Sequence, residues 1–189
     1  MNKTHTLLAK LIHWTFIPLY AYGIFKQVDD LGQLEDASLL NFEILFATVF
    51  LIIVLLRYFY MKDTPVLLGA HNDVHKGHLF IAKIVHRLVY FSLIMLPTTG
   101  LLIAGLISIN TGGVEIAIVI HEFSAFLSYV VIALHVGATL YSRYKSEGLW
   151  NAMVPIWKET GKNKSDLVKK LEIIENKIYE KVEDTFSKS

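Results

Sequence analysis

The sequence contains no cysteine and is poor in charged residues. Of its 189 residues, none is Cys, 4 are Pro and 19% are charged. The absence of thiols excludes disulfide bonds, cysteine-ligated zinc or iron–sulfur clusters and a catalytic thiol. Soluble domains carry about 25% charged residues, so the charge content does not favour that class. The formal net charge of +1 also gives no basic surface for nucleic acid.

Hydrophobic residues make up 53% of the chain and are concentrated in four long segments. These segments are residues 7–24, 39–60, 79–109 and 114–141. A helix needs about 20 apolar residues to cross the hydrocarbon core of a bilayer. The sequence therefore predicts an all-α integral membrane protein with a bundle of four spanning helices.

Basic residues are distributed unequally between the two ends of these segments. One end collects Lys3, Lys10, Arg57, Lys62, Lys76, Lys83, Arg87, Arg143 and Lys145. The other end has Lys26, among the acidic residues Asp29, Asp30, Glu35 and Asp36. Because loops rich in Lys and Arg stay on the cytoplasmic side of a membrane, both termini are predicted to be cytoplasmic.

The last part of the sequence has a different character. Apolar residues recur there at helical spacing among lysines and glutamates, namely Leu167, Leu171, Ile174, Ile178 and Val182. The pattern predicts a transmembrane domain over residues 1–157 and a cytoplasmic amphipathic helical tail over residues 158–189. Three interpretations of the tail are open: a solvated and partly packed helix, docking onto a soluble partner, and self-association, which includes a homodimer.

Two histidines lie in the fourth segment, and ionisable residues inside a membrane segment are usually functional. His121 and His135 are fourteen residues apart. Fourteen helical steps return to within about 40° of the same face and rise about 21 Å. One helix face therefore presents an imidazole near each membrane surface, and the small residues Ala125 and Ser128 between them leave space for a bulky group.

This arrangement favours haem over a helix–helix hydrogen bond or a proton relay. Imidazole is the usual nitrogen ligand of haem iron, and without cysteine the haem would be a non-covalently held haem b. His13 and His135 lie at similar depths and can face each other across one porphyrin. His121 needs a partner from the start of the second segment or the end of the third. Glu43 has the right depth there, but it is not a histidine.

Several motifs resemble the bacterial cytochrome b561 family over roughly residues 7–145. The I-H-W around His13 is similar to the opening of the family's first helix, and the H-E at His121 with the L-H at His135 is similar to its fourth-helix signature. The L-P-x-x-G that ends at Gly100 resembles its third helix, and Arg57 falls where its second helix ends in Arg. The wider family includes the cytochrome subunits of nickel–iron hydrogenases and formate dehydrogenases.

The resemblance implies a ligand set. His13 and His135 would ligate a cytoplasmic-side haem, and His121 a periplasmic-side haem. The family's fourth ligand is a second-helix histidine fourteen residues before the helix-ending Arg, and Glu43 occupies that position here. Glu43 could ligate weakly, leave the iron five-coordinate, or hydrogen-bond His121 in a chain that binds one haem. We expect two haems.

Other polar residues have two interpretations each. Arg57 and Arg87 either pair with haem propionates, since the Arg fork matches carboxylates, or extend towards the membrane surface as ordinary positive residues. His86 is expected to make an interfacial hydrogen bond, and the alternative is that it replaces a family ligand. A solvated loop is expected to hold three more histidines, namely His71, His75 and His78. These histidines would suit a metal or a proton relay only if that loop were helical.

A bis-histidine iron has no open coordination position and transfers single electrons. The predicted function is that of a membrane b-type cytochrome between an electron donor and the quinone pool, as an electron-transfer protein or a quinone-linked oxidoreductase. The alternative is a membrane-anchor subunit that relays electrons for a larger hydrogenase or dehydrogenase complex. A third hypothesis is a haem-free transporter or structural protein. The expected location is multi-pass in the bacterial cytoplasmic (inner) membrane, in contact with lipid.

Overall fold

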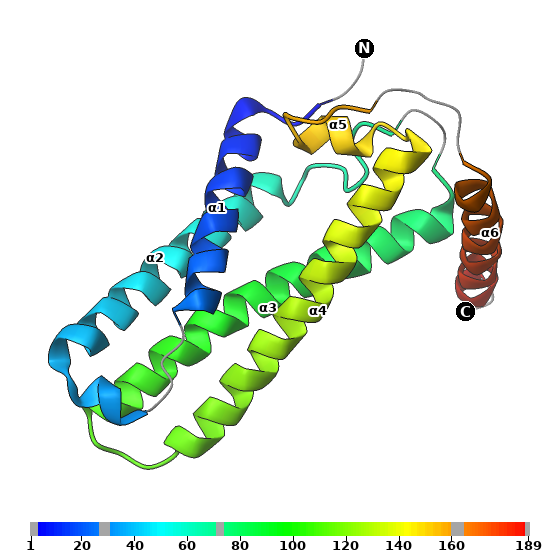
Figure 1. The fold of residues 1–189 in the computed structure, drawn as a ribbon. Helices are drawn as coiled ribbons and strands as arrows, with labels where there is room; N and C mark the ends of the chain where they lie inside the picture. Colours follow the sequence, from blue (N-terminus) through cyan, green and yellow to red (C-terminus); the bar gives the residue numbers. More distant parts are fainter. Residues whose placement is uncertain (1–3, 27–30, 71–73, 160–164, 188–189) are drawn as a thin grey trace. The chain divides into compact units, whose positions relative to one another are not determined.

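The computed structural model is helical throughout, with short connections, over the residues it describes, which are 4–26, 31–70, 74–159 and 165–187. The elements in chain order are α1 Leu7–Phe25, the 3-10 helix η1 Leu31–Glu35, α2 Ala37–Met61, α3 Lys76–Ser108, α4 Val114–Lys145, α5 Leu149–Met153 and α6 Asp166–Ser187 (Figure 1). The predicted all-α class is therefore confirmed.

Helices α1 to α4 are long and apolar enough to cross a membrane. Between 11% and 33% of the most apolar stretch of each is buried within the protein. Most of these apolar side chains therefore face outwards, as expected for helices in lipid. The four predicted segments are confirmed, although α3 and α4 extend beyond them, to Lys76 and Lys145. The cytoplasmic position of the termini stays a prediction.

The chain divides into two compact units, which are described separately. The first unit contains Leu7–Asp63 and Leu88–Val131, and the second contains Met1–Thr6, Thr64–Arg87 and Ile132–Ser189. Helices α3 and α4 each contribute residues to both units. This division does not test the predicted domain boundary after residue 157, which stays a prediction.

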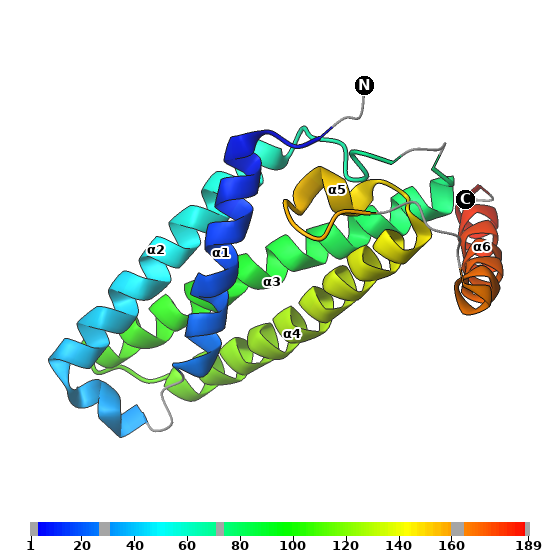
Figure 2. The same ribbon diagram turned by 45° about the horizontal axis from the view of Figure 1, so that its top comes forward.

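In the first unit, α1 and α2 lie side by side (Figure 2). The Phe16 and Phe50 rings pack with their centroids 4.9 Å apart. Gly23 permits close approach, because a Cβ added there would lie 3.3 Å from the Phe46 ring. Asp36 caps the start of α2 by accepting a hydrogen bond of 2.8 Å from the Ser38 amide.

Small hydroxyl residues are buried along the parts of α3 and α4 in the first unit. Ser92, Ser124 and Ser128 are at most 1% exposed, and each donates its hydroxyl proton to a carbonyl of its own helix. Residues of this size allow membrane helices to approach closely. The hydroxyl protons of these three serines all have acceptors, as buried polar groups generally do.

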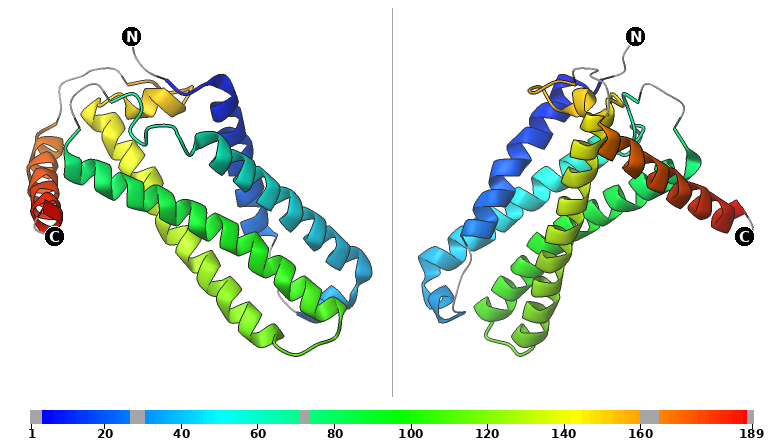
Figure 3. Two further views of the ribbon diagram at one scale, coloured as in Figure 1. Left: turned by 180° about the vertical axis from the view of Figure 1, so that it is seen from behind. Right: turned by 45° about the vertical axis from the view of Figure 1, so that its right-hand side comes forward.

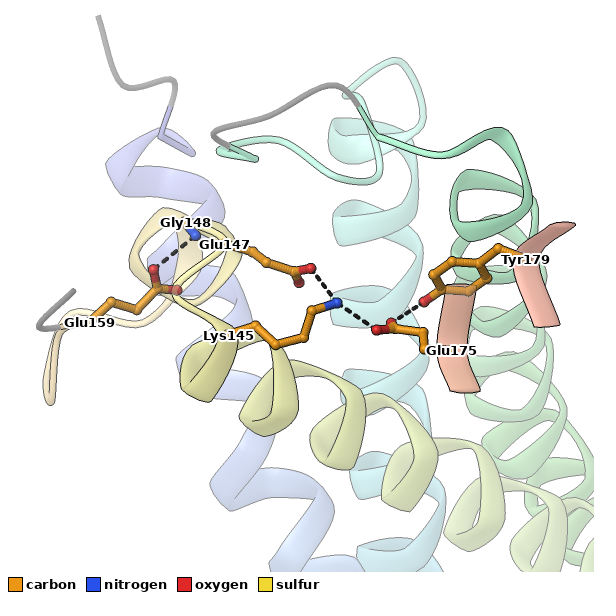
Figure 4. A network of polar contacts seen from close by, with 6 residues as sticks. All are labelled: Lys145, Glu147, Gly148, Glu159, Glu175 and Tyr179. Atoms are coloured by element: carbon orange, nitrogen blue, oxygen red, sulfur yellow. Dashed lines mark hydrogen bonds and ion pairs between the residues drawn. The ribbon is translucent and has the colours of Figure 1, made fainter. Parts of the chain in front are cut away.

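In the second unit, α6 packs beside the start of α3 and the end of α4 (Figure 3). A Cβ added at Gly77 would lie 2.8 Å from the Cα of Tyr179, so the two backbones meet with no room for a side chain. Lys145, which is 6% exposed, contacts the carboxylates of Glu147 at 2.5 Å and Glu175 at 2.6 Å. Tyr179 donates its hydroxyl proton to Glu175 (Figure 4).

The short helix α5, which the sequence did not predict, follows α4 directly. It begins after Gly148, whose φ of 91° is in the left-handed region. Glu159 accepts hydrogen bonds from the amides of Gly148 at 2.8 Å and Trp150 at 3.2 Å, and Figure 4 shows the first of these. A carboxylate at a helix start satisfies amides that have no partner within the helix.

Candidate functional site

The first unit holds the imidazole of His121 in a defined orientation. Its Nδ1 lies 2.9 Å from Oγ1 of Thr99. The Thr99 hydroxyl proton is directed to the carbonyls of Met95 and Leu96, at 2.8 and 3.0 Å, so Oγ1 can only accept from His121. The proton of neutral His121 therefore sits on Nδ1, and Nε2 carries the lone pair that a metal ligand needs.

His121 and Glu43 both line one cavity of about 400 Å³ in the first unit. The wall is mainly apolar and includes Phe46, Phe50 and Gly100. A Cβ added at Gly100 would lie 3.5 Å from Cε1 of His121, so any larger side chain would crowd the imidazole. An apolar cavity with an oriented imidazole fits the requirements of a haem b site.

Glu43 forms an ion pair with Lys26, which directly follows α1. The Lys26 ammonium also lies 4.8 Å from the centroid of the Phe42 ring, within the range of a cation–π interaction. Side-chain exposure is 20% for Lys26 and 23% for Glu43. Of the three interpretations of Glu43, the direct hydrogen bond to His121 is not the contact that the structure records.

The space predicted beside Ala125 and Ser128 is only partly present. Ala125 lines the cavity. The hydroxyl of Tyr20, however, donates to Oγ of Ser128 at 2.7 Å, because the Ser128 proton is already directed to the Ala125 carbonyl. The phenol of Tyr20 therefore occupies the position next to Ser128, and the cavity lies on the His121 side of it.

The second unit brings His135 next to His86. Their ring centroids are 4.9 Å apart and the ring planes are nearly perpendicular, at 87°. His86 Nδ1 lies 2.8 Å from the Ala82 carbonyl. A carbonyl can only accept, so the proton of neutral His86 is on Nδ1 and Nε2 carries the lone pair. The expected interfacial hydrogen bond of His86 is thus made within its own helix.

His13 belongs to the first unit and His135 to the second. The structure places the His13 ring edge-on to Trp14, with the centroids 6.2 Å apart. The predicted pairing of His13 with His135 joins residues of different units and stays a prediction. The sequence gives His86 a ligand role only as an alternative and does not place it beside His135, because similar depth does not specify which helices face each other.

The two candidate propionate partners have different surroundings. Arg57 is half-buried, with Nη1 at 3.5 Å from the Ala9 carbonyl and the Tyr90 hydroxyl beside it. It therefore connects α1, α2 and α3 within the first unit. Arg87 is exposed, as expected for a basic residue near a membrane surface. A role of either residue with haem propionates stays a prediction.

The loop histidines are not simply solvated. His78 lies in α3, and its ring stacks on Tyr179 of α6 with centroids 4.9 Å apart and planes at 5°. His75, just before α3, lies 5.9 Å from the same ring, and His71 is outside the described residues. Burial and the neighbouring Glu175 carboxylate raise the pKa of Tyr179 far above its usual value, so its hydroxyl keeps its proton.

Some residues of these sites had weak sequence signals. Thr99 could have been sought as a partner of His121, but only the packing of α3 against α4 selects it over the adjacent Thr98. Lys26 was noted only for its charge, although it is the basic residue nearest in depth to Glu43. Among the described residues, no group of three or more His, Asp or Glu side chains gathers as a metal site. Axial haem ligation needs only one or two imidazoles.

Four membrane-spanning helices with oriented imidazoles define a membrane protein suited to holding haem between its helices. The family model described as prokaryotic cytochrome b561 matches residues 4–155, and the chain belongs to this family. No curated protein and no solved structure matched the chain. Family membership makes it a multi-pass membrane cytochrome of the b type that acts in electron transfer. Helix α6 lies outside the matched residues.

Proposed function

We propose that the protein transfers electrons between a donor and the quinone pool of the bacterial cytoplasmic membrane. In this proposal His13 and His135 ligate one haem b and His121 ligates a second. Family membership supports the type of haem and the class of function. Haem b supplies one-electron oxidation and reduction at its iron.

The observation that carries the proposal is the contact of His121 Nδ1 with Oγ1 of Thr99, at 2.9 Å. In the neutral ring Thr99 accepts from Nδ1–H, which leaves the Nε2 lone pair available without a conformational change. The wall of the cavity around the imidazole is mainly apolar, which suits the face of a porphyrin. A ring held in this way can ligate iron in both redox states with little movement, which favours fast electron transfer.

A quinone is the partner that fits a protein of this kind. The electron carrier must diffuse within the bilayer, and the outward-facing apolar residues of α1 to α4 allow a lipid-soluble molecule to reach the protein. The chain has no cysteine for an iron–sulfur cluster of its own. Electrons therefore have to arrive from, and leave to, separate molecules.

The proposal is tested by absorption spectroscopy and quinol reduction of the purified full-length chain. We expect a Soret band, two haems per chain by pyridine haemochrome, and reduction of the haem by a quinol analogue. A chain purified from haem-replete cells without any Soret band would refute haem binding. If dithionite reduces the haem but quinols do not, the proposed quinone partner is refuted.

A second candidate is a membrane subunit that relays electrons within a larger dehydrogenase or hydrogenase. Helix α6 favours this role, because it lies outside the family match and exposes Leu167, Ile174 and Ile178 by half or more. Mild solubilisation followed by size-exclusion chromatography tests it. Co-elution of the cytochrome with an iron–sulfur protein would favour the subunit role over an independent cytochrome.

A further inference from the structure

The cavity at His121 contains a carboxylate where a second imidazole would complete a bis-histidine site. That carboxylate, Glu43, is already paired with Lys26. To ligate iron, Glu43 would have to leave the Lys26 ammonium. The side chains of Lys26 and Glu43 are 20% and 23% exposed, so their separation would leave two partly buried charges without a partner, which is unfavourable. The pairing therefore favours retention of the Lys26 contact over coordination of iron.

The other polar residues of the cavity wall are poor substitutes for a second ligand. The described residues that line it include one imidazole and no thioether. The hydroxyl of Tyr20 is bonded to Ser128. Glu122 and Tyr129 lie on the same helix as His121 and are exposed. A side chain of the same helix does not reach the side of an iron opposite His121. The wall thus supplies a single well-prepared axial ligand, His121.

We propose that the iron of a haem at His121 keeps one axial position open to a small exogenous ligand. This inference rests on the proposed function, since it requires haem in this cavity. Because Lys26 and Glu43 remain paired, the pair adds hydrogen-bond donors to the wall without a net charge. The ligand class is therefore small molecules that coordinate haem iron, such as cyanide in the ferric state and carbon monoxide in the ferrous state.

The site at His135 provides an internal comparison. The ring centroid of His86 lies 4.9 Å from that of His135, which is too close for a porphyrin to lie between these two rings. The family resemblance supplies His13 as a second imidazole for a haem on His135. A haem on His135 is therefore expected to be six-coordinate, with no position for carbon monoxide. The two haems of one chain should consequently differ in their response to the same ligand.

The test uses the full-length protein, both in native membranes and purified in detergent. The dithionite-reduced protein is titrated with carbon monoxide and the oxidised protein with cyanide, and the Soret shift is compared with the total haem. We expect half of the haem to bind each ligand. The oxidised protein should also show a high-spin electron paramagnetic resonance signal that cyanide removes.

The decisive variant is Glu43→His, which supplies the missing imidazole on α2. It should convert the high-spin signal to low spin and reduce carbon monoxide binding at least tenfold. Asn41→His is the matched control, because Asn41 lies on the same helix, is exposed and does not line the cavity. The control should bind carbon monoxide as the unmodified chain does.

Each outcome separates this inference from the proposed function. Two haems per chain that do not respond to carbon monoxide or cyanide would overturn the open position. One haem per chain, lost in His135→Ala, would show that the cavity at His121 holds none, and would overturn the inference while leaving electron transfer through the other haem. A chain without haem would overturn the proposed function itself.

Discussion

The proton position on an imidazole decides whether a histidine can bind a metal, and single hydrogen bonds decide it here. His121 is fixed by a threonine on the neighbouring helix, whose hydroxyl proton is committed elsewhere. His86 is fixed by a carbonyl one turn earlier in its own helix. In both cases Nε2 carries the lone pair. A hydrogen-bond acceptor on the ring nitrogen that does not bind the metal orients the histidine and raises the basicity of the nitrogen that does.

Replacing Thr99 by Val should weaken haem binding at His121. The isosteric change removes the acceptor for Nδ1–H, so the ring loses its preferred tautomer and orientation. Loss of such an acceptor typically lowers metal affinity about 10–100-fold. Haem titration of the apoprotein would show this as a weakened second binding phase. Thr98→Val is the control, because Thr98 is exposed and bonds only the Ile94 carbonyl; an equal loss in both variants would contradict the role of Thr99.

Three alanine variants distinguish the ligand assignments around His135. If His13 and His135 ligate the same iron, His13→Ala and His135→Ala should each lower the haem content by about half, because a haem without a covalent link would lose one of the two axial bonds around which that site is built. His86→Ala should keep the haem content, with a shifted midpoint potential. Pyridine haemochrome measures the content and a redox titration the potential. Loss of haem in His86→Ala with retention in His13→Ala would reassign the ligand.

At the scale of elements, the sequence predicts those features that depend on local periodicity. Apolar runs long enough to span a bilayer gave α1 to α4, and helical spacing placed His121 and His135 on one face of α4. The connections between helices were harder to predict from the sequence. Helix α5 depends on the carboxylate of Glu159, which reaches back to the amide of Gly148, and no periodicity encodes such a contact.

Contacts between elements were the hardest features to predict from the sequence. The stacking of His78 on Tyr179 joins residues about a hundred positions apart, and the pairing of Lys26 with Glu43 joins the end of one helix to the next. Sequence spacing defines a face of a helix but not the element against which that face packs. For this reason the candidate ligands named from the sequence stay predictions, while the residues that contact them were found only in the structure.

Gly77→Val should detach α6 from α3. A Cβ at Gly77 would lie 2.8 Å from the Cα of Tyr179, and a backbone atom cannot move aside without moving the helix. Amide hydrogen exchange across α6 should become faster by tenfold or more, equivalent to at least about 1.4 kcal/mol. Gly105→Val is the control on the same helix, because no atom lies within 4 Å of a Cβ added there. Unchanged exchange in α6 of the Gly77 variant would contradict the close packing.

At the scale of the whole molecule, each compact unit contains one of the two fourth-helix histidines. The family match includes both units up to residue 155 and leaves out α6. The tail nevertheless contributes Glu175 to the contacts of the buried Lys145 at the end of α4. The haem sites and the docked tail are therefore expected to be separable in function while they are coupled in stability.

A chain ending at Glu159, which keeps the carboxylate that α5 depends on, should keep its full haem content and lose stability. Lys145 would retain Glu147 but lose Glu175, and a hydrogen bond to a charged group contributes about 1.5–3 kcal/mol. For a protein of this size each kcal/mol corresponds to about 2–4 °C in the melting midpoint. Pyridine haemochrome and thermal denaturation measure the two effects, and Glu175→Gln in the full-length chain isolates the lost contact. Full haem content is expected because neither candidate site draws a described ligand from beyond residue 157. A halved haem content in the shortened chain would show instead that the tail belongs to the haem-binding domain.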